Sequence, residues 1–413
     1  MTLPDVDASA VLAHVRDSRS EIITQLAEWV RMESPSDRPE TQEPLLAALA
    51  EAFQAVGYRT LHCPSVETGG QLYARPERRA PCQPAQLLLG HCDTVWPVGT
   101  LETMPVSVED DGTMRGPGIY DMKGGLVQMV FALRTLQALD IEPAVTPVVF
   151  INSDEEIGSP ASRPRIRRLA RVVDRVFVLE PSLGRDGKLK TARKGIGRFA
   201  VEVTGKSSHA GLDPGGGASA IQELSHVIQK LHALSDPEKG RSVNVGQIEG
   251  GQRPNVVAPS SRAVVDVRVR TQEDAEWMTR RIRNLEPSTP GVTLHVDGHF
   301  GRPPMERTPR NRMLWHLAQE AAERLGLVLD EGRAGGASDG NETSPFTATL
   351  DGLGPVGDGA HAAHEFVFID RLLERTALLA LLLLAAPLGT PSTGHTASQA
   401  SQAPLSNPTN SRG

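Results

Sequence analysis

The pattern of apolar residues divides the chain into regions of different periodicity. In the first 194 residues, some segments carry Leu, Ile and Val at three- and four-residue steps, as amphipathic helices do. Others are short, continuous apolar runs bounded by polar residues, which is typical of buried strands. The helical segments are 8–31, 43–57 and 124–139, and the strand-like runs begin at Gln86, 146 and 175. Because these helices and strands alternate, we predict an α/β sheet with parallel neighbouring strands.

Period-two alternation replaces this pattern after residue 194. Three segments (197–211, 241–251 and 261–270) alternate apolar and polar residues, as half-buried strands do. Helical spacing lies between and after them, at 217–234 and 272–285. Two helices on one face of a small sheet would make an α+β insert of about a hundred residues.

Helical spacing returns at 310–326, after the predicted insert. We therefore predict an α/β domain in two parts, with an α+β insert between them and a disordered tail rich in Ser, Thr and Pro. The predicted boundaries are 1–194 and 307–387 for the two parts, 195–306 for the insert and 388–413 for the tail.

Candidate chemistry lies at the ends of the predicted strands and in glycine-rich loops. Five short segments, GHCDTV, GPGIYDMKGG, INSDEEIGS, VFVLEPS and GAHAAHEF, each carry a His or a carboxylate. The residues are His91, Asp121, Glu156, Glu180 and His364. Open α/β sheets place their sites at the carboxyl ends of strands. Two His and three carboxylates are a donor set that can hold two zinc ions through one shared carboxylate.

Alternatives remain open for single residues. His361 is a rival to His364 as a ligand, three residues earlier. Asp121, just before the helix near residue 124, is also placed to act as an N-cap. The adjacent acids of SDEE repel one another unless a cation neutralises them. If Glu156 binds that cation, its neighbour Glu155 is free to act as a base.

His91 and Asp93 lie two positions apart at the end of a predicted strand. Alternate side chains of a strand share a face, so Asp93 is placed to fix the His91 ring while Cys92 points away.

Composition excludes several function classes. With 413 residues and 39% hydrophobic content, the chain has room for two or three domains. A net charge of −7 and 4% aromatic residues argue against a nucleic-acid groove or an anionic membrane partner. Three cysteines without a CxxC motif argue against a disulfide scaffold. The N-terminus lacks a signal-peptide pattern, and the apolar run 377–386 is about half the roughly 20 residues of a membrane span. We expect a cytoplasmic protein with a buried C-terminal helix.

Taken together, the motifs resemble those of the co-catalytic zinc metallopeptidases of family M20, over about residues 8–387. GGASDGN at Gly335 and GPVGDGAHAAHEFV most resemble the glutamate-carboxypeptidase branch. The resemblance implies a catalytic domain with a mostly parallel, mixed sheet flanked by helices and interrupted by an α+β lid and dimerisation domain. It implies that His91 and Glu180 hold one zinc, that Glu156 and His364 hold the other, and that Asp121 bridges them.

The resemblance also implies roles beyond the ligands. Asp93 would orient His91, Glu155 would be the general base, and Co²⁺ or Mn²⁺ could replace Zn²⁺. The lid would pair two subunits, with His209 reaching the partner's site. The remaining candidates grip the substrate carboxylate: Arg302, Asn255 and Arg268.

The motifs predict a zinc-dependent hydrolase of an amide or peptide bond, and the branch resemblance implies release of a C-terminal amino acid such as glutamate from a peptide or N-acyl conjugate. A zinc-bridging hydroxide would attack, with Glu155 as base. A deacylase for acetylornithine or succinyl-diaminopimelate is the first alternative, since the motifs do not separate the two. A non-catalytic binding protein on the same scaffold is more remote, because no ligand or base is missing. A dimerisation module with incidental carboxylates leaves SDEEIGS unexplained.

Overall fold

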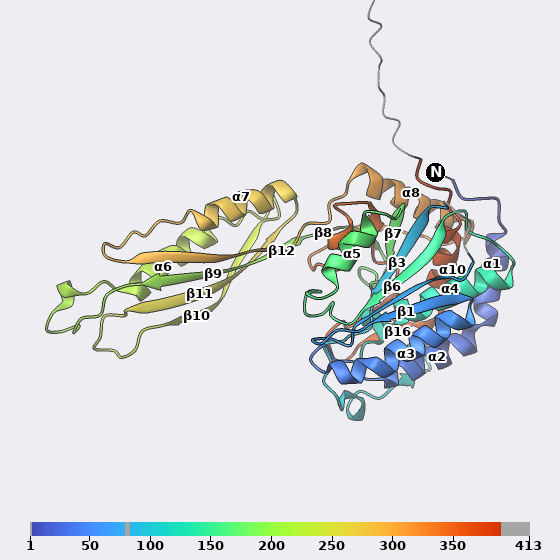
Figure 1. Cartoon of the computed structure of the whole chain (residues 1–413), viewed down its shortest axis with the longest axis horizontal. Helices are drawn as coiled ribbons and strands as arrows, with labels where there is room; N and C mark the ends of the chain where they lie inside the picture. The colour runs from blue at the N-terminus through green and yellow to red at the C-terminus, as the bar shows by residue number, and fades with distance from the viewer. Residues whose placement is uncertain (1, 79–82, 390–413) are drawn as a thin grey trace, which may run out of the picture.

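A computed structural model describes residues 2–78 and 83–389. The chain forms two lobes joined by two chain segments (Figure 1). We call the lobe formed by the N- and C-terminal parts of the chain the α/β domain. The other, formed by the strands and helices between Gly195 and Arg302, is the insert domain. Residues 390–413, which make up nearly all of the predicted tail, lie outside the described residues.

A six-stranded mixed sheet forms the centre of the α/β domain, in the order β1-β2-β6-β3-β7-β14. Strands β6, β3, β7 and β14 are parallel to one another, while β2 pairs antiparallel with β6 and with the edge strand β1. The predicted α/β fold with a mixed sheet is confirmed. The strand bounds are β1 Tyr58–Cys63, β2 Gln71–Pro76, β3 Ala85–His91, β6 Thr146–Asn152, β7 Arg175–Val178 and β14 Ala348–Leu350.

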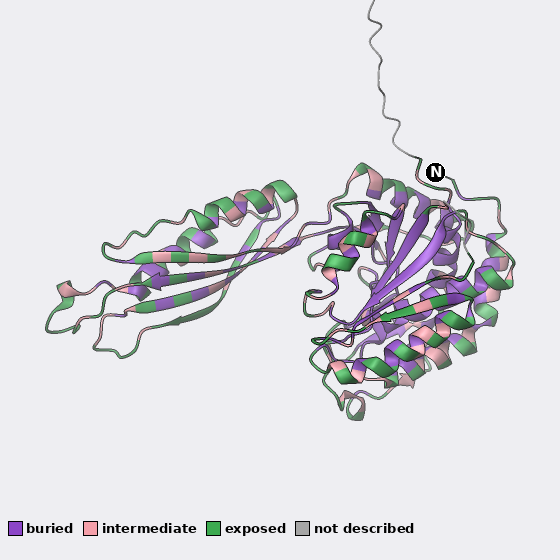
Figure 2. Cartoon of the chain, viewed as in Figure 1, coloured by how far each residue is buried: buried purple, intermediate pink, exposed green. Residues whose placement is uncertain are grey.

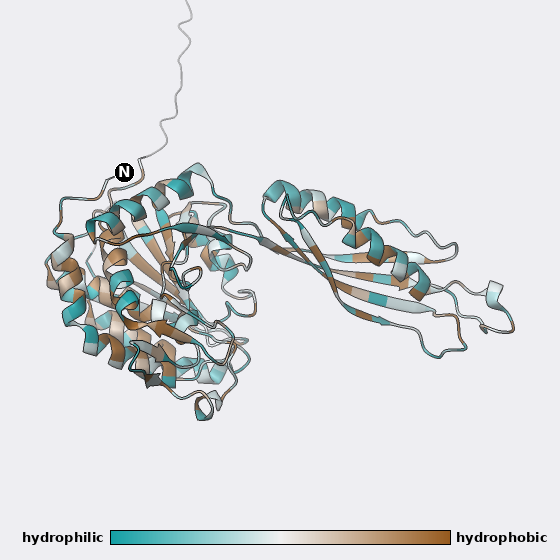
Figure 3. Cartoon of the chain, turned by 180° about the vertical axis from the view of Figure 1, so that it is seen from behind, coloured by the Kyte–Doolittle hydropathy of each residue, from teal (hydrophilic) through white to brown (hydrophobic). Residues whose placement is uncertain are grey.

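Helices cover both faces of this sheet, which explains why its central strands are continuous apolar runs. Every residue of β3 and β6 is buried (Figure 2). Along β3, Leu88 belongs to the larger core, whereas Leu87 and Leu89 belong to the core on the other face. Figure 3 shows largely hydrophobic strands among helices in which hydrophobic and hydrophilic residues alternate. Burial on both faces is the usual state of parallel strands.

Six helices contribute buried side chains to the larger core, and α5 contributes to the smaller core. Their bounds, with the short helix α9, are α1 Ala8–Asp17, α2 Arg19–Arg31, α3 Pro39–Ala55, α4 Gly124–Ala138, α5 Arg163–Ala170, α8 Pro309–Arg324, α9 Gly340–Thr343 and α10 Ile369–Leu383. The helix predicted over 8–31 is two helices in the structure, α1 and α2. They meet at Ser18, whose hydroxyl donates a hydrogen bond to the His14 carbonyl. The predicted C-terminal helix is α10, and no helix of the described chain meets the length and apolarity of a membrane span.

Helix α4 approaches the sheet unusually closely at its first turn. A Cβ added to Gly125 would lie 2.1 Å from the Leu179 carbonyl oxygen, so only glycine fits there. This contact brings the turn that precedes α4 beside the end of β7.

Two smaller sheets complete the α/β domain. One is four-stranded in the order β15-β16-β5-β4, and the other pairs β8 with β13 in parallel. Their bounds are β4 Ser107–Val108, β5 Thr113–Arg115, β8 Leu189–Arg193, β13 Glu331–Ala334, β15 Gly357–Asp358 and β16 Phe366–Phe368. The apolar pattern does not reveal β8, because buried charged residues interrupt it.

The insert domain is a four-stranded antiparallel sheet in the order β10-β11-β9-β12, with α6 and α7 on one face (Figure 1). Along β9, buried residues alternate strictly with more exposed residues, as the sequence pattern predicts. We did not predict β12, in which Gly298 breaks the pattern. Gly298 has φ +117° and lies against the Arg198 carbonyl. The bounds are β9 Gly195–Thr204, β10 Ser242–Gly250, β11 Ser260–Val269, β12 Thr293–Arg302, α6 Ala220–His232 and α7 Gln272–Arg283.

Candidate active site

The polar residues singled out in the α/β domain meet at the carboxyl edge of its parallel strands. His91 is the last residue of β3, Glu155 and Glu156 follow β6, and Glu180 follows β7. Asp121 comes from the turn that leads into α4. Parallel strands bring their carboxyl ends to one edge, so the ends of β3, β6 and β7 converge there, and the close approach of Gly125 to Leu179 places the Asp121 turn beside them.

Asp121 stands between two histidines. Its Oδ1 lies 3.3 Å from Nε2 of His91, and its Oδ2 lies 3.6 Å from Nε2 of His361. Each histidine also faces a second carboxylate: His91 Nε2 is 3.5 Å from Glu180 Oε1, and His361 Nε2 is 3.2 Å from Glu156 Oε2. The cluster therefore has two halves joined through one carboxylate.

The structure revises one predicted ligand. Both histidines are exposed, but His361, the rival, contacts two carboxylates of the cluster, whereas no hydrogen bond or ion pair joins His364 to it among the described residues. The cause is the loop conformation: His361 has φ +60°, and the Glu365 side chain turns into the protein. The segment is a turn and not an extended strand, so no alternation in the sequence separates the two histidines.

Burial and close contacts shift the pKa values of the ionisable groups in the cluster. Burial raises the pKa of Glu156 to about 6. Hydrogen bonds to Asp121 and Glu156 raise the pKa of His361 to about 10. Burial opposes the charge on Asp121, yet the hydrogen bonds of His361 and His91 hold its pKa below the usual range. Such strong mutual perturbation is typical of functional sites.

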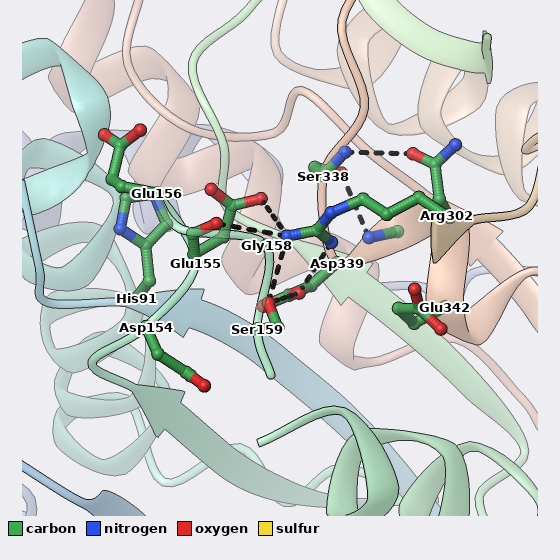
Figure 4. A network of polar contacts seen from close by, with 12 residues as sticks. His91, Asp154, Glu155, Glu156, Gly158, Ser159, Arg302, Ser338, Asp339 and Glu342 are labelled. Atoms are coloured by element: carbon green, nitrogen blue, oxygen red, sulfur yellow. Dashed lines mark hydrogen bonds and ion pairs between the residues drawn. The ribbon is translucent and has the colours of Figure 1, made fainter. Parts of the chain in front are cut away.

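Glu155 lies beside the cluster and is held by a cation. Arg302, at the end of β12, donates from Nη2 to Glu155 Oε1 at 2.9 Å and from Nη1 to Asp339 Oδ1 at 2.9 Å, and Figure 4 shows its guanidinium between the two. Burial nevertheless raises the pKa of Glu155 well above its usual range, which suits a group that must take up a proton. Arg302 was predicted to grip substrate. Here Nη1 and Nη2 bind protein groups, and Nη2 also reaches Ser159 at 3.0 Å.

Asp93 ties two of the converging segments together. Its carboxylate accepts the backbone N–H of Glu155 and of Glu156, each at 3.1 Å, and the Ser36 hydroxyl at 2.7 Å. The same carboxylate lies 3.4 Å from Nδ1 of His91, and that ring nitrogen is 2.9 Å from the Asp93 backbone oxygen. The predicted orienting group therefore contacts both the ring and the SDEE segment.

The third acid of SDEE, Asp154, does not join the site. Its Oδ2 accepts the backbone N–H groups of Ala161 and Ser162, at 2.8 and 3.1 Å, before helix α5. In Figure 4 it points away from Glu155 and Glu156. The repulsion that we inferred from three adjacent acids thus involves two of them at the site.

Two cations that the apolar pattern does not reveal lie on β8. Arg193 donates to both oxygens of Asp351, at 2.8 and 2.9 Å, and reaches Glu180 Oε2 at 3.3 Å. Burial lowers the pKa of Lys190, on which the charges of Asp351 and Glu180 also act. No local sequence signal identifies them, because their burial depends on acids from other segments.

The predicted lid residues lie apart from this cluster. His209 follows the distal end of β9, where it pairs with Val256, and the Ala210 N–H donates to the Asn255 carbonyl. His209 and Asn255 are exposed. Arg268 of β11 instead lies near the α/β domain, where it donates to the Gly335 carbonyl at 3.1 Å.

Cys92 is buried in the larger core, and its thiol lies outside the groups that could hold a metal among the described residues. Burial raises the pKa of the Cys92 thiol, so the thiol keeps its proton.

Two overlapping groups offer ligand atoms within 4.8 Å of one another. They are His91 with Glu155 and Glu180, and His91 with Asp121 and Glu156. Among the described residues, nothing donates to the buried Oε1 of Glu156. A buried carboxylate oxygen without a donor is costly unless a cation meets it. These residues therefore fit a bound metal.

Comparison with known proteins agrees with this geometry. The chain is 32% identical to carboxypeptidase G2 of Pseudomonas sp. (strain RS-16), over 72% of this chain and 73% of that protein. Its fold matches aminopeptidase PepT of Bacillus cereus ATCC 10987 with a TM-score of 0.73 at 20% identity, covering 89% and 98% of the two chains.

A second structural match is YXEP of Bacillus subtilis, described as a dinuclear metal binding peptidase from the M20 family. The TM-score is 0.64 at 16% identity, covering 89% and 98% of the chains. The model of peptidase family M20/M25/M40 matches residues 87–385. The converging strand ends, the paired histidines and this match agree with the predicted resemblance: the chain belongs to peptidase family M20/M25/M40 and is a hydrolase of peptide or amide bonds.

Proposed function

We propose that this enzyme is a carboxypeptidase with two metal ions, which releases a C-terminal amino acid such as glutamate from a peptide or an N-acyl conjugate. The observation that carries the proposal is Asp121, which presents one oxygen to each of two histidines. The 32% identity to carboxypeptidase G2 supports the choice of substrate class.

The residues divide between two metal positions. His91 and Glu180 would hold one ion, His361 and Glu156 the other, and Asp121 both. Imidazole and carboxylate suit Zn²⁺, with Co²⁺ or Mn²⁺ as possible substitutes. Metal ions bound there would supply a polarised carbonyl and a water whose pKa is lowered to roughly 7. The description of the B. subtilis neighbour as dinuclear supports this division.

Glu155 would take a proton from the attacking water and return it to the leaving amine. Its carboxylate has ligand atoms within 4.8 Å of those of His91 and Glu180. Because burial raises its pKa, the protonated form is accessible after attack. Arg302 would keep this carboxylate in place through the 2.9 Å contact to Oε1.

The cations near the site favour an acidic group on the substrate. Lys190 is buried close enough for the charges of Glu180 and Asp121 to act on it, and Arg268 lies at the junction of the two domains. Arg268, with Asn255, is our candidate to bind the carboxylate of the released amino acid, because the predicted third group, Arg302, is occupied by Glu155 and Asp339. Arg suits this role because its planar group meets a carboxylate through two hydrogen bonds.

We also propose that two chains pair through their insert domains. His209 and Asn255 lie on loops at the end of β9 and β11 that is remote from their own α/β domain. In a dimer these loops would reach the partner's site, where His209 would stabilise the oxyanion.

The test is amine release by zinc-loaded protein from a panel of substrates. The panel contains glutamate-ended dipeptides, a folate, acetylornithine and succinyl-diaminopimelate. Glu155→Gln should keep its metal and lose about 10²- to 10⁴-fold in turnover, the usual contribution of a general base. Glu51→Gln, at an exposed position of α3, is the matched control and should behave as wild type.

The panel also distinguishes the alternatives. Fastest release from acetylornithine or succinyl-diaminopimelate would replace the carboxypeptidase assignment with a deacylase. Wild-type turnover by Glu155→Gln would remove Glu155 from the chemistry. No release from any substrate by protein with two bound metals would contradict the proposed substrate class.

A further inference from the structure

Glu365 carries a buried carboxylate that four N–H groups surround, although neither the motifs nor the proposed chemistry assigns it a role. The residue is 1% exposed. Its Oε1 accepts the backbone N–H of Tyr120 at 2.9 Å and of Asp121 at 3.1 Å. Its Oε2 accepts the backbone N–H of Gly118 at 3.0 Å and the indole N–H of Trp96 at 2.8 Å. All four donors therefore converge on one side chain.

Three of these donors belong to the turn that carries Asp121. That turn is irregular, with non-helical angles at Asp121 (φ −116°, ψ 96°), so its N–H groups lack the regular partners of a helix. Glu365 supplies the partners from a segment 244 residues away. A carboxylate that accepts several backbone N–H groups fixes the position of that backbone.

Glu365 itself belongs to the loop that carries His361. Two short turns define the loop: the Ala362 N–H donates to the Gly359 carbonyl at 2.8 Å, and the Glu365 N–H donates to the Ala362 carbonyl at 3.0 Å. Gly359 has φ +83°, and a Cβ there would lie 2.9 Å from the Glu365 Cα. The position of His361 is therefore linked through a rigid turn to the carboxylate that holds the Asp121 segment.

Asp93 provides a parallel on the other side of the cluster. Its carboxylate joins His91 to the backbone of Glu155 and Glu156, just as that of Glu365 joins the His361 loop to the backbone of Asp121. Together the two buried carboxylates connect the segments of four of the five metal-binding residues. Groups behind metal ligands orient them and influence affinity.

We propose that Glu365 is a positioning residue for the paired metal site, which sets Asp121 between His91 and His361 by joining the turn of Asp121 to the loop of His361. The inference rests on the proposed function, because it assumes that the cluster binds two metal ions. Asp121 makes contacts of 3.3 and 3.6 Å to the two histidines, so a small shift of its backbone disturbs both halves at once.

The test measures metal affinity of Glu365→Gln by competition with a chelator, using Zn²⁺ and Co²⁺ and counting bound metal after dialysis. The amide oxygen can still accept two N–H groups, but the amide NH₂ must face two other donors. We expect affinity for at least one metal to fall about 10- to 100-fold, the range for groups behind metal ligands.

Glu33→Gln is the matched control. Glu33 also accepts backbone N–H groups, those of Gly99 at 2.8 Å and Leu101 at 3.1 Å, but in a loop that carries no proposed ligand. A role in stability alone would make the two variants lose thermal stability without loss of metal affinity. Unchanged affinity in Glu365→Gln, with two metals bound, overturns the proposal and leaves the proposed function intact.

Trp96→Phe keeps the test decisive if Glu365→Gln does not fold. This variant removes one of the four donors and leaves the carboxylate. It should weaken metal binding by a few-fold, and wild-type affinity in Trp96→Phe together with an unfolded Glu365→Gln would contradict the proposal. Failure of the wild-type protein to bind two metals would instead contradict the proposed function itself.

Discussion

Charged residues are used in opposite ways at the edge of the central sheet and on the outer face of the insert sheet. At the edge of the central sheet, Arg302 and Glu155 form an ion pair whose side chains are only 8% and 11% exposed. On the insert domain, Arg262 and Glu202 form a pair on neighbouring strands with side chains 49% and 55% exposed. The site at the sheet edge confines opposite charges where water cannot screen them, whereas the outer face of the insert sheet keeps them in solvent. Identical residue types therefore have different energetic weight in the two regions.

This difference indicates where function resides. A buried charge persists only when a partner compensates it, so each buried acid at the sheet edge must have a cation or several N–H donors nearby. Arg302, Arg193 and the backbone N–H groups serve Glu155, Glu180 and Glu365 in this way, and Glu156 Oε1 lacks such a partner among the described residues. The same rule holds inside the insert domain, where the buried carboxylate of Glu223 accepts the backbone N–H groups of Ser288 at 2.9 Å and Thr289 at 2.6 Å.

Metal removal gives the largest expected effect and should affect one domain only. Dialysis against a chelator should abolish hydrolysis, and Zn²⁺ or Co²⁺ should restore it. Thermal stability of the α/β domain should fall on removal, because ligand binding to the native state stabilises it. Hydrogen exchange would locate the change: faster exchange in the turn of Asp121, with β9 and β11 unchanged, is expected. Equal loosening of both domains would contradict the comparison.

Removal of Arg302 gives the next effect. Arg302→Ala leaves Glu155 and Asp339 buried without their cation, and breaking a buried pair costs about 3–5 kcal/mol. Urea unfolding measures this loss. The control is Arg268→Ala, whose pair with Asp266 has side chains 36% and 37% exposed, so that loss should stay below about 1 kcal/mol. Similar losses in both variants would show that burial does not separate the two pairs.

His209→Ala tests whether the insert domain contributes to chemistry in a partner chain. Loss of an oxyanion donor typically costs about 10²- to 10³-fold in kcat, and metal content should not change. Mixing His209→Ala with Glu155→Gln should restore activity, because a mixed dimer contains one site with both groups intact. If mixing restores nothing although the chains exchange, His209 does not act across a dimer.

Arg262→Ala in the insert domain gives the smallest effect. The pair with Glu202 is half exposed, and such pairs contribute about 0.2–1 kcal/mol. Urea unfolding should therefore detect a loss within this range, and turnover should equal that of wild type. A loss above 2 kcal/mol would mean that the surface of the insert domain is more constrained than its exposure indicates.

The sequence pattern predicted the segments that are buried either along their whole length or on one face only. Strands β3 and β6 and helix α10 are buried apolar runs, and β9 and β11 alternate on one covered face, so each local pattern matches its environment. The pattern failed at β8, where Lys190 and Arg193 are buried by their proximity to acids from other segments. It failed at β12 because Gly298 interrupts the alternation.

Much of the candidate site could also be named from the sequence, but not its contacts. His91, Asp121, Glu155, Glu156 and Glu180 stand in distinctive motifs, and the structure brings all five together. Which of His361 and His364 joins the site depends on the backbone angles of the loop, and two histidines in one loop sequence do not reveal those angles. The pairing of Arg302 with Glu155 joins residues 147 positions apart, which a single sequence cannot encode in any local pattern.

The most direct test of the account counts metal ions in two histidine variants. His361→Ala removes a ligand from one half of the cluster, whereas His364→Ala, three residues away, changes an exposed side chain. Elemental analysis of protein dialysed in buffered Zn²⁺ should find two metals per chain in wild type and His364→Ala, and one or none in His361→Ala, with hydrolysis lost in the same variant. Two metals in His361→Ala and fewer in His364→Ala would contradict the paired site that the structure brings together.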